Sequence, residues 1–249
     1  MQILSTVGMF IIPCFAYGYL CLDNPTSFFQ LNKKTKISPT LITISLAILA
    51  LPFINLLSYI NQKLELPASM ASIEAWMKSS ELAANQLTEQ FLMVDNIGGV
   101  MLNIFVIAVL PALGEELFFR GTLQNTLAKH TSNHIAIWTC AILFSAIHLQ
   151  FYGFLPRMLM GAMLGYLLVW SKSLWLPITA HFINNASAVL CYYFIQNTKI
   201  MTTESFDSLG TKDTLYLGII SGATTIVGIY FLRRSLTINN ASSRKSIGN

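Results

Sequence analysis

Two adjacent glutamates, Glu115 and Glu116, lie in a segment (100–127) that is apolar enough to be inside a lipid bilayer. Ionisable side chains are costly in hydrocarbon, so those that occur there indicate a functional site by default. Arg120 follows on the same segment. Later apolar segments carry three more polar side chains of the kind found in catalytic sites: His148, His181 and Asn185. The fold of this chain therefore has to shelter a cluster of polar groups from lipid.

Composition sets the fold class. The chain of 249 residues is 54% hydrophobic and only 10% charged, whereas a soluble domain carries about a quarter charged residues. Since backbone groups in lipid must be hydrogen-bonded within the chain, we expect an all-α membrane protein. The small net charge of +4 is dispersed, and no basic stripe with interleaved aromatic residues indicates nucleic-acid binding.

Apolar segments near the ~20 residues needed to cross a bilayer follow one another along the chain. They predict a polytopic helical bundle with about seven to eight transmembrane helices. The first has no basic residues before it and is expected to be a retained helix rather than a signal peptide. The third either is one span bent at Pro111 or is followed by a separate half-helix or crossing at 114–129. The segments are 3–22, 38–60, 97–113 (running on toward 127), 134–151, 154–170, 174–195 and 215–232.

The basic residues divide unequally between the two sides of a seven-span arrangement. Positively charged loops stay in the cytoplasm, so this asymmetry predicts an outside N-terminus and a cytoplasmic C-terminus. We expect a multi-pass integral membrane protein. The cytoplasmic side would hold Lys33, Lys34, Lys36, Lys129, Lys172, Arg233, Arg234, Arg244 and Lys245; the other side would hold Lys63, Lys78, Arg157, Lys199 and Lys212.

Three parts follow from this organisation. Residues 1–96 hold two spans and an amphipathic helix, 97–195 form a catalytic membrane core, and 196–249 hold an outer loop, the last span and a polar cytoplasmic tail. Within 61–96, apolar residues recur at threes and fours, which predicts the amphipathic helix. It either lies on the bilayer surface or acts as a lid over an intramembrane site.

Spacing along the helices divides the polar residues into pairs. Glu116 and Arg120 are four residues apart and can form an ion pair on one helix face. Glu115 is offset by about 100° and is left available for acid–base chemistry. His181 and Asn185 share a face in the same way. Neither a His-Glu-x-x-His nor a Gly-x-Ser-x-Gly motif is present.

The residues resemble three motifs of one family. Glu115-Glu116-Leu-Phe-Phe-Arg120 is similar to its Glu-Glu-x-x-x-Arg motif, Phe144-Ser-Ala-Ile-His148 to its Phe-x-x-x-His motif, and His181-Phe-Ile-Asn-Asn185 to its His-x-x-x-Asn motif. This is the CPBP family of intramembrane proteases, which comprises type II CAAX prenyl proteases and the bacteriocin-processing or immunity proteins of the Abi family. The resemblance covers residues 111–188.

The resemblance implies peptide-bond hydrolysis within a membrane. Since many members of the family occur in bacteria, we expect this to be a bacterial cytoplasmic membrane. Glu115 and His148 would activate the attacking water. His181 and Asn185 would stabilise the oxyanion, and Glu116 with Arg120 would orient the site. The substrate would be a peptide or membrane protein that enters from the lipid, whose prenylation and identity stay open, as does the oligomeric state.

The metal requirement is also open at this point. Members of the family are often described as metalloproteases, and Glu115, His148 and His181 supply a ligand set that zinc sites use. No ligand pair has the compact spacing of a preformed zinc motif, and water activation by a carboxylate and an imidazole needs no metal. We therefore favour a metal-independent mechanism.

Two other classes of function compete with the protease. A non-catalytic immunity or scaffold protein of the same family would keep the pocket for binding, although a binder needs no water-activating pair. A transporter or proton relay also buries Glu and His residues. Such transporters usually have repeated halves with paired broken helices, and the sequence offers a break only at Pro111.

Overall fold

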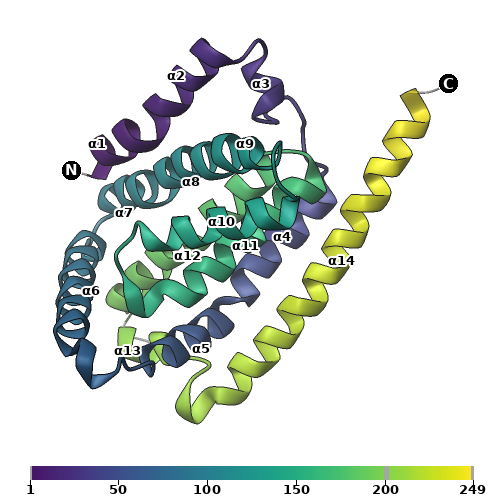
Figure 1. The fold of residues 1–249 in the computed structure, drawn as a ribbon. Helices are drawn as coiled ribbons and strands as arrows, with labels where there is room; N and C mark the ends of the chain where they lie inside the picture. Colours follow the sequence, from purple (N-terminus) through teal and green to yellow (C-terminus); the bar gives the residue numbers. More distant parts are fainter. Residues whose placement is uncertain (1, 199–201, 248–249) are drawn as a thin grey trace.

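The computed structural model of the chain describes residues 2–198 and 202–247, and every regular element in those ranges is helical (Figure 1). The predicted all-α bundle is confirmed. Short turns of 3-10 or π type carry η labels. The elements are α1 (Gln2–Thr6), η1 (Val7–Ile11), α2 (Ile12–Cys21), α3 (Pro25–Phe28), α4 (Ile37–Leu49), α5 (Leu51–Gln62), η2 (Ala68–Met70), α6 (Ala71–Leu92), α7 (Ile97–Asn103), η3 (Ile104–Val109), α8 (Leu110–Glu116), η4 (Leu117–Gln124), α9 (Asn125–Leu127), α10 (Asn133–Ala146), η5 (Phe151–Gly153), α11 (Phe154–Ser171), α12 (Trp175–Thr198), α13 (Thr203–Asp207), η6 (Lys212–Thr214) and α14 (Leu215–Ile247).

The helices form one bundle around α11 and α12. In Figure 1 the rod made by α7, α8 and α9 crosses above α10, α11 and α12, and α14 runs along one side of the molecule. The N-terminal helices α1 and α2 lie against that rod, on the side that faces away from α10, α11 and α12. The core contains mainly leucines of α11, α12 and α14, among them Leu164, Leu167, Leu176 and Leu232.

The predicted number of seven to eight spans is not confirmed. Each predicted segment contains a helix, but only four helices in the described ranges are long and apolar enough to cross a bilayer, or five if one bent pair counts as a span. Helix α10 has only 14 residues. Helix α12 is long enough, but its histidine, asparagines and tyrosines lower its hydropathy. The four are Ile3–Cys21, Ile97–Leu127, Phe151–Ser171 and Lys212–Thr237.

The bent pair replaces the single span expected at 38–60. Helices α4 and α5 meet at an angle of 45°. Pro52, at the start of α5, has no N–H and clashes with a helical carbonyl four residues earlier, so it breaks the helix. Ser221 of α14 covers the break, because its hydroxyl donates to the carbonyl of Leu49 and accepts from the N–H of Phe53. A polar side chain of a neighbouring helix thus satisfies the freed backbone groups.

Pro111 behaves differently from Pro52. Residues Ile97–Leu127 form one continuous helix of 31 residues, so the structure contains no separate crossing at 114–129 and no break at Pro111. The preceding turns of η3 are π-helical, and the N–H of Leu110 bonds to the carbonyl of Phe105, five residues earlier. A widened turn of this kind accommodates a proline without breaking the helix.

Close contact between α10 and α11 depends on glycine. A Cβ atom at Gly161 would lie 3.2 Å from the Cα of Ala141 and 3.3 Å from the ring of Phe144. Four residues later, a Cβ at Gly165 would lie 3.0 Å from Ile137. Small residues four apart let helices in a membrane approach closely. The short α10 is therefore held against α11 by backbone-to-backbone packing.

We expect Gly161→Val to lower the free energy of unfolding by about 1–3 kcal/mol, because overpacking forces the two helices apart. The same substitution at Gly8, where a Cβ would meet nothing within 4 Å, is the control and should change stability by about 0.5 kcal/mol or less. Thermal unfolding of both variants in detergent measures the difference. Equal stability of the two would contradict this packing.

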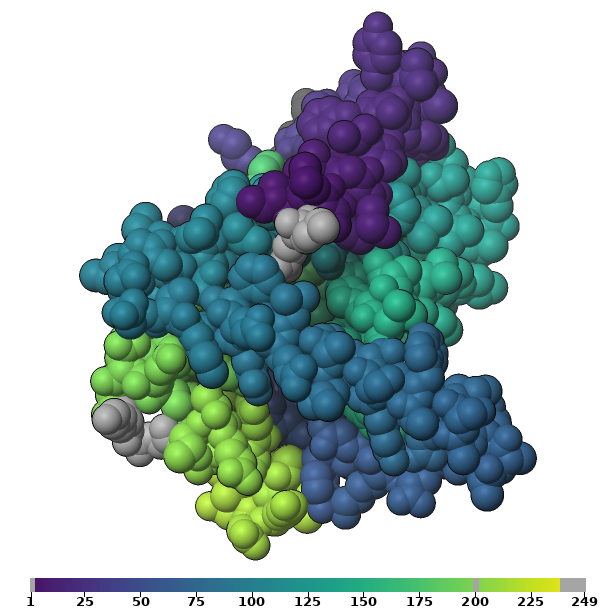
Figure 2. Space-filling view, turned by 90° about the vertical axis from the view of Figure 1, so that its left-hand side faces the viewer, coloured from purple at the N-terminus to yellow at the C-terminus, as the bar shows by residue number. Residues whose placement is uncertain are grey.

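The predicted amphipathic helix is α6, and Figure 2 shows it in blue across one face of the molecule. Its apolar side chains point outward: Trp76 is 51% and Leu87 57% exposed. Glu81 instead faces the protein and accepts a hydrogen bond from the N–H of Tyr152 at 3.3 Å. An outward apolar face suits a helix in contact with lipid. Helix α6 also contacts η5. Both interpretations of this helix, as a helix on the bilayer surface or as a lid over an intramembrane site, remain predictions.

Candidate active site

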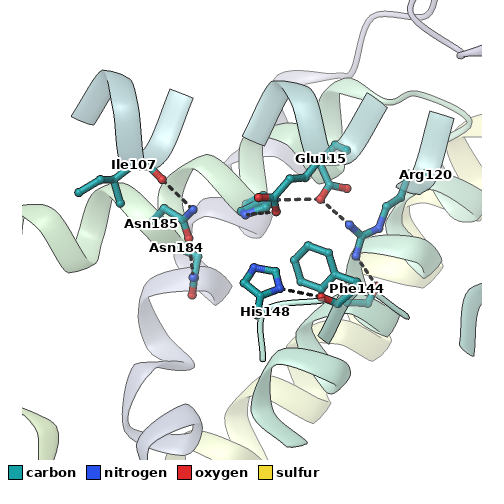
Figure 3. A network of polar contacts seen from close by, with 10 residues as sticks. Ile107, Glu115, Arg120, Phe144, His148, Asn184 and Asn185 are labelled. Carbon is teal, nitrogen blue, oxygen red and sulfur yellow. Dashed lines mark hydrogen bonds and ion pairs between the residues drawn. The ribbon is translucent and has the colours of Figure 1, made fainter. Parts of the chain in front are cut away.

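A cavity of about 380 Å³ opens between α5, α8, α11 and α12. Four of the six predicted site residues line it: Glu115, His148, His181 and Asn185. They come from α8, from the loop after α10, and from α12, so residues 70 positions apart in the sequence face one space. Figure 3 shows the labelled side chains of Glu115, His148 and Asn185 pointing toward this space. The other two predicted residues, Glu116 and Arg120, lie behind the cavity wall.

Glu116 and Arg120 form the ion pair that their spacing predicts. An Nη1 of Arg120 lies 2.6 Å from Oε1 of Glu116, and both side chains have no exposed surface. Arg120 also donates through Nη2 to the carbonyl of Gly161 at 2.9 Å. One turn later, Gln124 donates to the carbonyl of Gly165 at 3.1 Å. Gly161 and Gly165 therefore have two effects. They allow α10 and α11 to pack closely, and their carbonyl oxygens accept hydrogen bonds from side chains of the 97–127 helix.

Glu116 also fixes His181. Its Oε1 lies 2.8 Å from Nδ1 of His181, which is 3% exposed. A carboxylate accepts hydrogen bonds, so Nδ1 of His181 carries the proton in this contact. Nε2 of His181 then faces Oε2 of Glu115 at 3.9 Å. With Nδ1–H donated to Glu116, Nε2 can donate to a substrate oxygen only when the ring is doubly protonated.

His148 uses the same ring nitrogen as His181 in a hydrogen bond within the protein. Its Nδ1 lies 2.7 Å from the carbonyl oxygen of Phe144. Since a carbonyl only accepts, Nδ1–H is the donor, and the lone pair of the neutral ring is on Nε2. The ring of Phe144 packs edge-on against those of His148 and His181, with centroids 5.1 and 5.9 Å apart. When neutral, His148 therefore has an Nε2 that can accept a proton, as His181 does.

Asn185 is held by the helix that carries Pro111. Pro111 has no N–H for the carbonyl four residues earlier, which is that of Ile107. The Nδ2 of Asn185 donates to this carbonyl at 3.0 Å, and the Nδ2 of Asn184 donates to Oδ1 of Asn185 at 3.2 Å. Both ends of the Asn185 amide are therefore engaged, which leaves one hydrogen on Nδ2 for another acceptor.

Two residues of the site were missed in the sequence, whereas Phe144 had been identified as part of a motif. Asn184 and Arg157 line the cavity, and the ring of Phe144 lies under the guanidinium of Arg120 at 4.8 Å. Arg157 was counted only as a basic residue of the outer side. The signal was present, because an arginine within an apolar helix is itself a functional-site indication. Asn184 lacks the four-residue spacing from His181 that singled out Asn185, so no signal in the sequence indicated it.

The proposed zinc ligands do not form a ligand set. In the part of the chain that the structure describes, no three His, Cys, Asp or Glu side chains are grouped so that they could hold a metal ion. The Nδ1 atoms of His148 and His181 are both used in hydrogen bonds within the protein, which leaves Nε2 of each ring, and these two nitrogens are not grouped with a third ligand in the described residues. The arrangement does not fit a zinc site, and no step below is assigned to a metal.

Comparison with known proteins agrees with this core. Residues 97–187 match the family Type II CAAX prenyl endopeptidase Rce1-like. The chain is also 33% identical over 88 residues to a Bacillus subtilis (strain 168) protein named "Uncharacterized protein YpbD". That match covers 34% of this chain and 42% of the relative, which is less than half of either. No solved structure matched at comparable significance.

The matched residues include every cavity-lining residue of α8, α10 and α11. They also include those of α12 except Ala188. The helices that carry it are apolar and include spans long enough to cross a bilayer. Over residues 97–187, which are less than half of its length, this multi-pass membrane protein is similar to the Rce1-like family of type II CAAX prenyl endopeptidases.

Proposed function

We propose that the protein is an intramembrane endopeptidase in which Glu115 and His148 activate water. One observation carries the proposal: Glu115, His148, His181 and Asn185 line a single cavity inside a bundle of apolar helices. The family match over 97–187 supports a peptide hydrolase. The substrate is a peptide or a membrane protein that reaches the cavity from the bilayer.

Attack by water needs an acceptor for its proton. Glu115 is 9% exposed and lies at the cavity wall without an ion-pair partner closer than 3.9 Å in the described residues. In the proposed step a water O–H bond breaks, its proton passes to Glu115, and its oxygen adds to the carbonyl carbon of the substrate. Nε2 of His148 accepts the second hydrogen bond of that water and so orients it. Glu115 then gives the proton to the leaving nitrogen as the C–N bond breaks.

The negative charge that develops on the carbonyl oxygen needs donors in place beforehand. The remaining hydrogen on Nδ2 of Asn185 supplies one. Nε2 of His181 supplies another when its ring is doubly protonated between Glu116 and Glu115. Glu116 and Arg120 do not contact the substrate in this scheme. They act indirectly, because Glu116 binds the ring of His181 and Arg120 binds Glu116.

The proposal is tested with protein purified in detergent and with peptides of apolar sequence. In water enriched in oxygen-18, mass spectrometry should find two products, one of which carries the heavy oxygen in its new carboxylate. Because the grouped side chains do not fit a metal site, cleavage should persist after dialysis against a chelator. A lost activity that returns with zinc alone would contradict the glutamate mechanism, and intact peptides throughout would contradict the protease.

A further inference from the structure

Arg157 is the one charged side chain of the cavity lining to which the proposed mechanism gives no role. It lies in the first turn of α11, directly after the η5 turn. Its guanidinium is held at two points by a single residue. Nη2 donates to Oε1 of Gln150 at 2.7 Å, and Nη1 donates to the carbonyl oxygen of Gln150 at 3.3 Å.

The η5 turn makes room for this guanidinium. A Cβ atom at Gly153 would lie 2.9 Å from Nη2 of Arg157, closer than Cβ atoms approach other atoms, so the guanidinium would have to shift. The absence of a side chain at Gly153 therefore lets the guanidinium pack onto the turn. Asn61 fixes the same turn, because it donates to the carbonyl of Phe151 at 2.7 Å and accepts from the N–H of Leu155 at 3.2 Å. The position of Arg157 is set by the fold.

The charge of Arg157 is not balanced by a direct partner. The ion pairs in the described residues join Lys78 to Glu74, Arg120 to Glu116, and His181 to the two adjacent glutamates, and none includes Arg157. Both groups of Gln150 that it contacts are neutral. A guanidinium has five N–H donors, and these two bonds use two of them, so three remain for a ligand in the cavity.

We propose that Arg157 binds a carboxylate of the substrate peptide. A guanidinium and a carboxylate match in charge and planar geometry, and they form short paired hydrogen bonds. The carboxylate comes either from the C-terminus of the peptide or from an acidic side chain near the bond that is cut. This assignment rests on the proposed function, because it takes a peptide to be the occupant of the cavity. Arg157 would then contribute to substrate selection and not to water activation.

The test uses four versions of one apolar peptide, which end in a carboxylate or a carboxamide and carry either glutamate or glutamine at one internal position. Their dissociation constants are measured by fluorescence anisotropy with the Glu115→Ala protein, so that binding is read without cleavage. We expect a carboxylate form to bind roughly tenfold to a hundredfold more tightly than its neutral match. The peptide pair that shows the preference identifies the source of the carboxylate.

Adding Arg157→Gln should remove that preference while neutral peptides bind as before. Arg157→Lys, which keeps the charge without the planar fork, should keep part of it. Arg234→Gln, which removes an exposed arginine of α14, is the matched control and should keep all of it. Equal binding of the four peptides, no binding of any, or a preference that survives Arg157→Gln would overturn the proposal. Carboxylate-selective binding without cleavage by the protein with Glu115 intact would count against the proposed function alone.

Discussion

Replacing Glu115 or His148 by alanine is expected to lower the rate of peptide cleavage by a factor of about 10²–10⁴ while the protein stays folded. Each side chain would accept or orient a proton of the attacking water, and losing a general base costs rates of this order. Their removal should not unfold the protein, since both line the cavity and neither belongs to the fully buried ion pair. Cleavage rates and thermal unfolding curves of the same samples separate the two effects.

Two substitutions outside the site provide matched controls. Glu65 and His130 are exposed and do not line the cavity, so Glu65→Ala and His130→Ala should cleave at the rate of the unaltered protein. Full activity of both cavity variants would rule out the water-activating pair. If Glu115→Gln lost cleavage but preserved the biological effect of the protein in cells, a non-catalytic role in binding would be favoured instead.

The arrangement within each helix was predictable from the sequence, because helical geometry is local. The four-residue spacing of Glu116 and Arg120 predicts their ion pair without knowledge of the fold. The same reasoning placed Glu115 on a different side of the helix. Convergence of Glu115 with His148 and His181 depended on how separate helices pack, and the sequence allowed this arrangement without requiring it. The roles of these residues in catalysis remain predictions.

Two features of the fold were not predictable in this way. Pro52 and Pro111 both lie in apolar segments, yet only Pro52 breaks its helix. The difference depends on partners from distant segments, which are Ser221 at the first proline and Asn185 near the second. The number of spans could not be fixed from the sequence, because hydropathy reports burial in lipid and burial in protein alike. Helix α10, with Ala141 and Phe144 buried, is shorter than a bilayer is thick.

Removing the charge of Arg120 should have the largest effect on stability. Arg120 and Glu116 are both fully buried, and Glu116 has an Oε2 atom without a hydrogen-bond partner in the described structure. Substituting Arg120→Met leaves the Glu116 carboxylate with His181 as its remaining partner. Breaking a buried pair on one side costs about 3–5 kcal/mol, because an uncompensated charge stays behind. Denaturant titration in detergent should show this loss as a shift of the midpoint.

The double variant Glu116→Gln/Arg120→Met separates the cost of a stranded charge from the value of the pair. A neutral amide can still accept the Nδ1–H of His181 through its oxygen, so the double variant should be more stable than Arg120→Met alone. The exposed pair Glu74 and Lys78 has the same spacing and a contact of 2.7 Å, and its double replacement should cause no measurable loss. If Arg120→Met were as stable as that surface control, the buried pair would not hold the helices together. If the double variant were stable but inactive, the charge of Glu116 would be required in addition to its hydrogen bond to His181, as expected if that ring acts in its doubly protonated form.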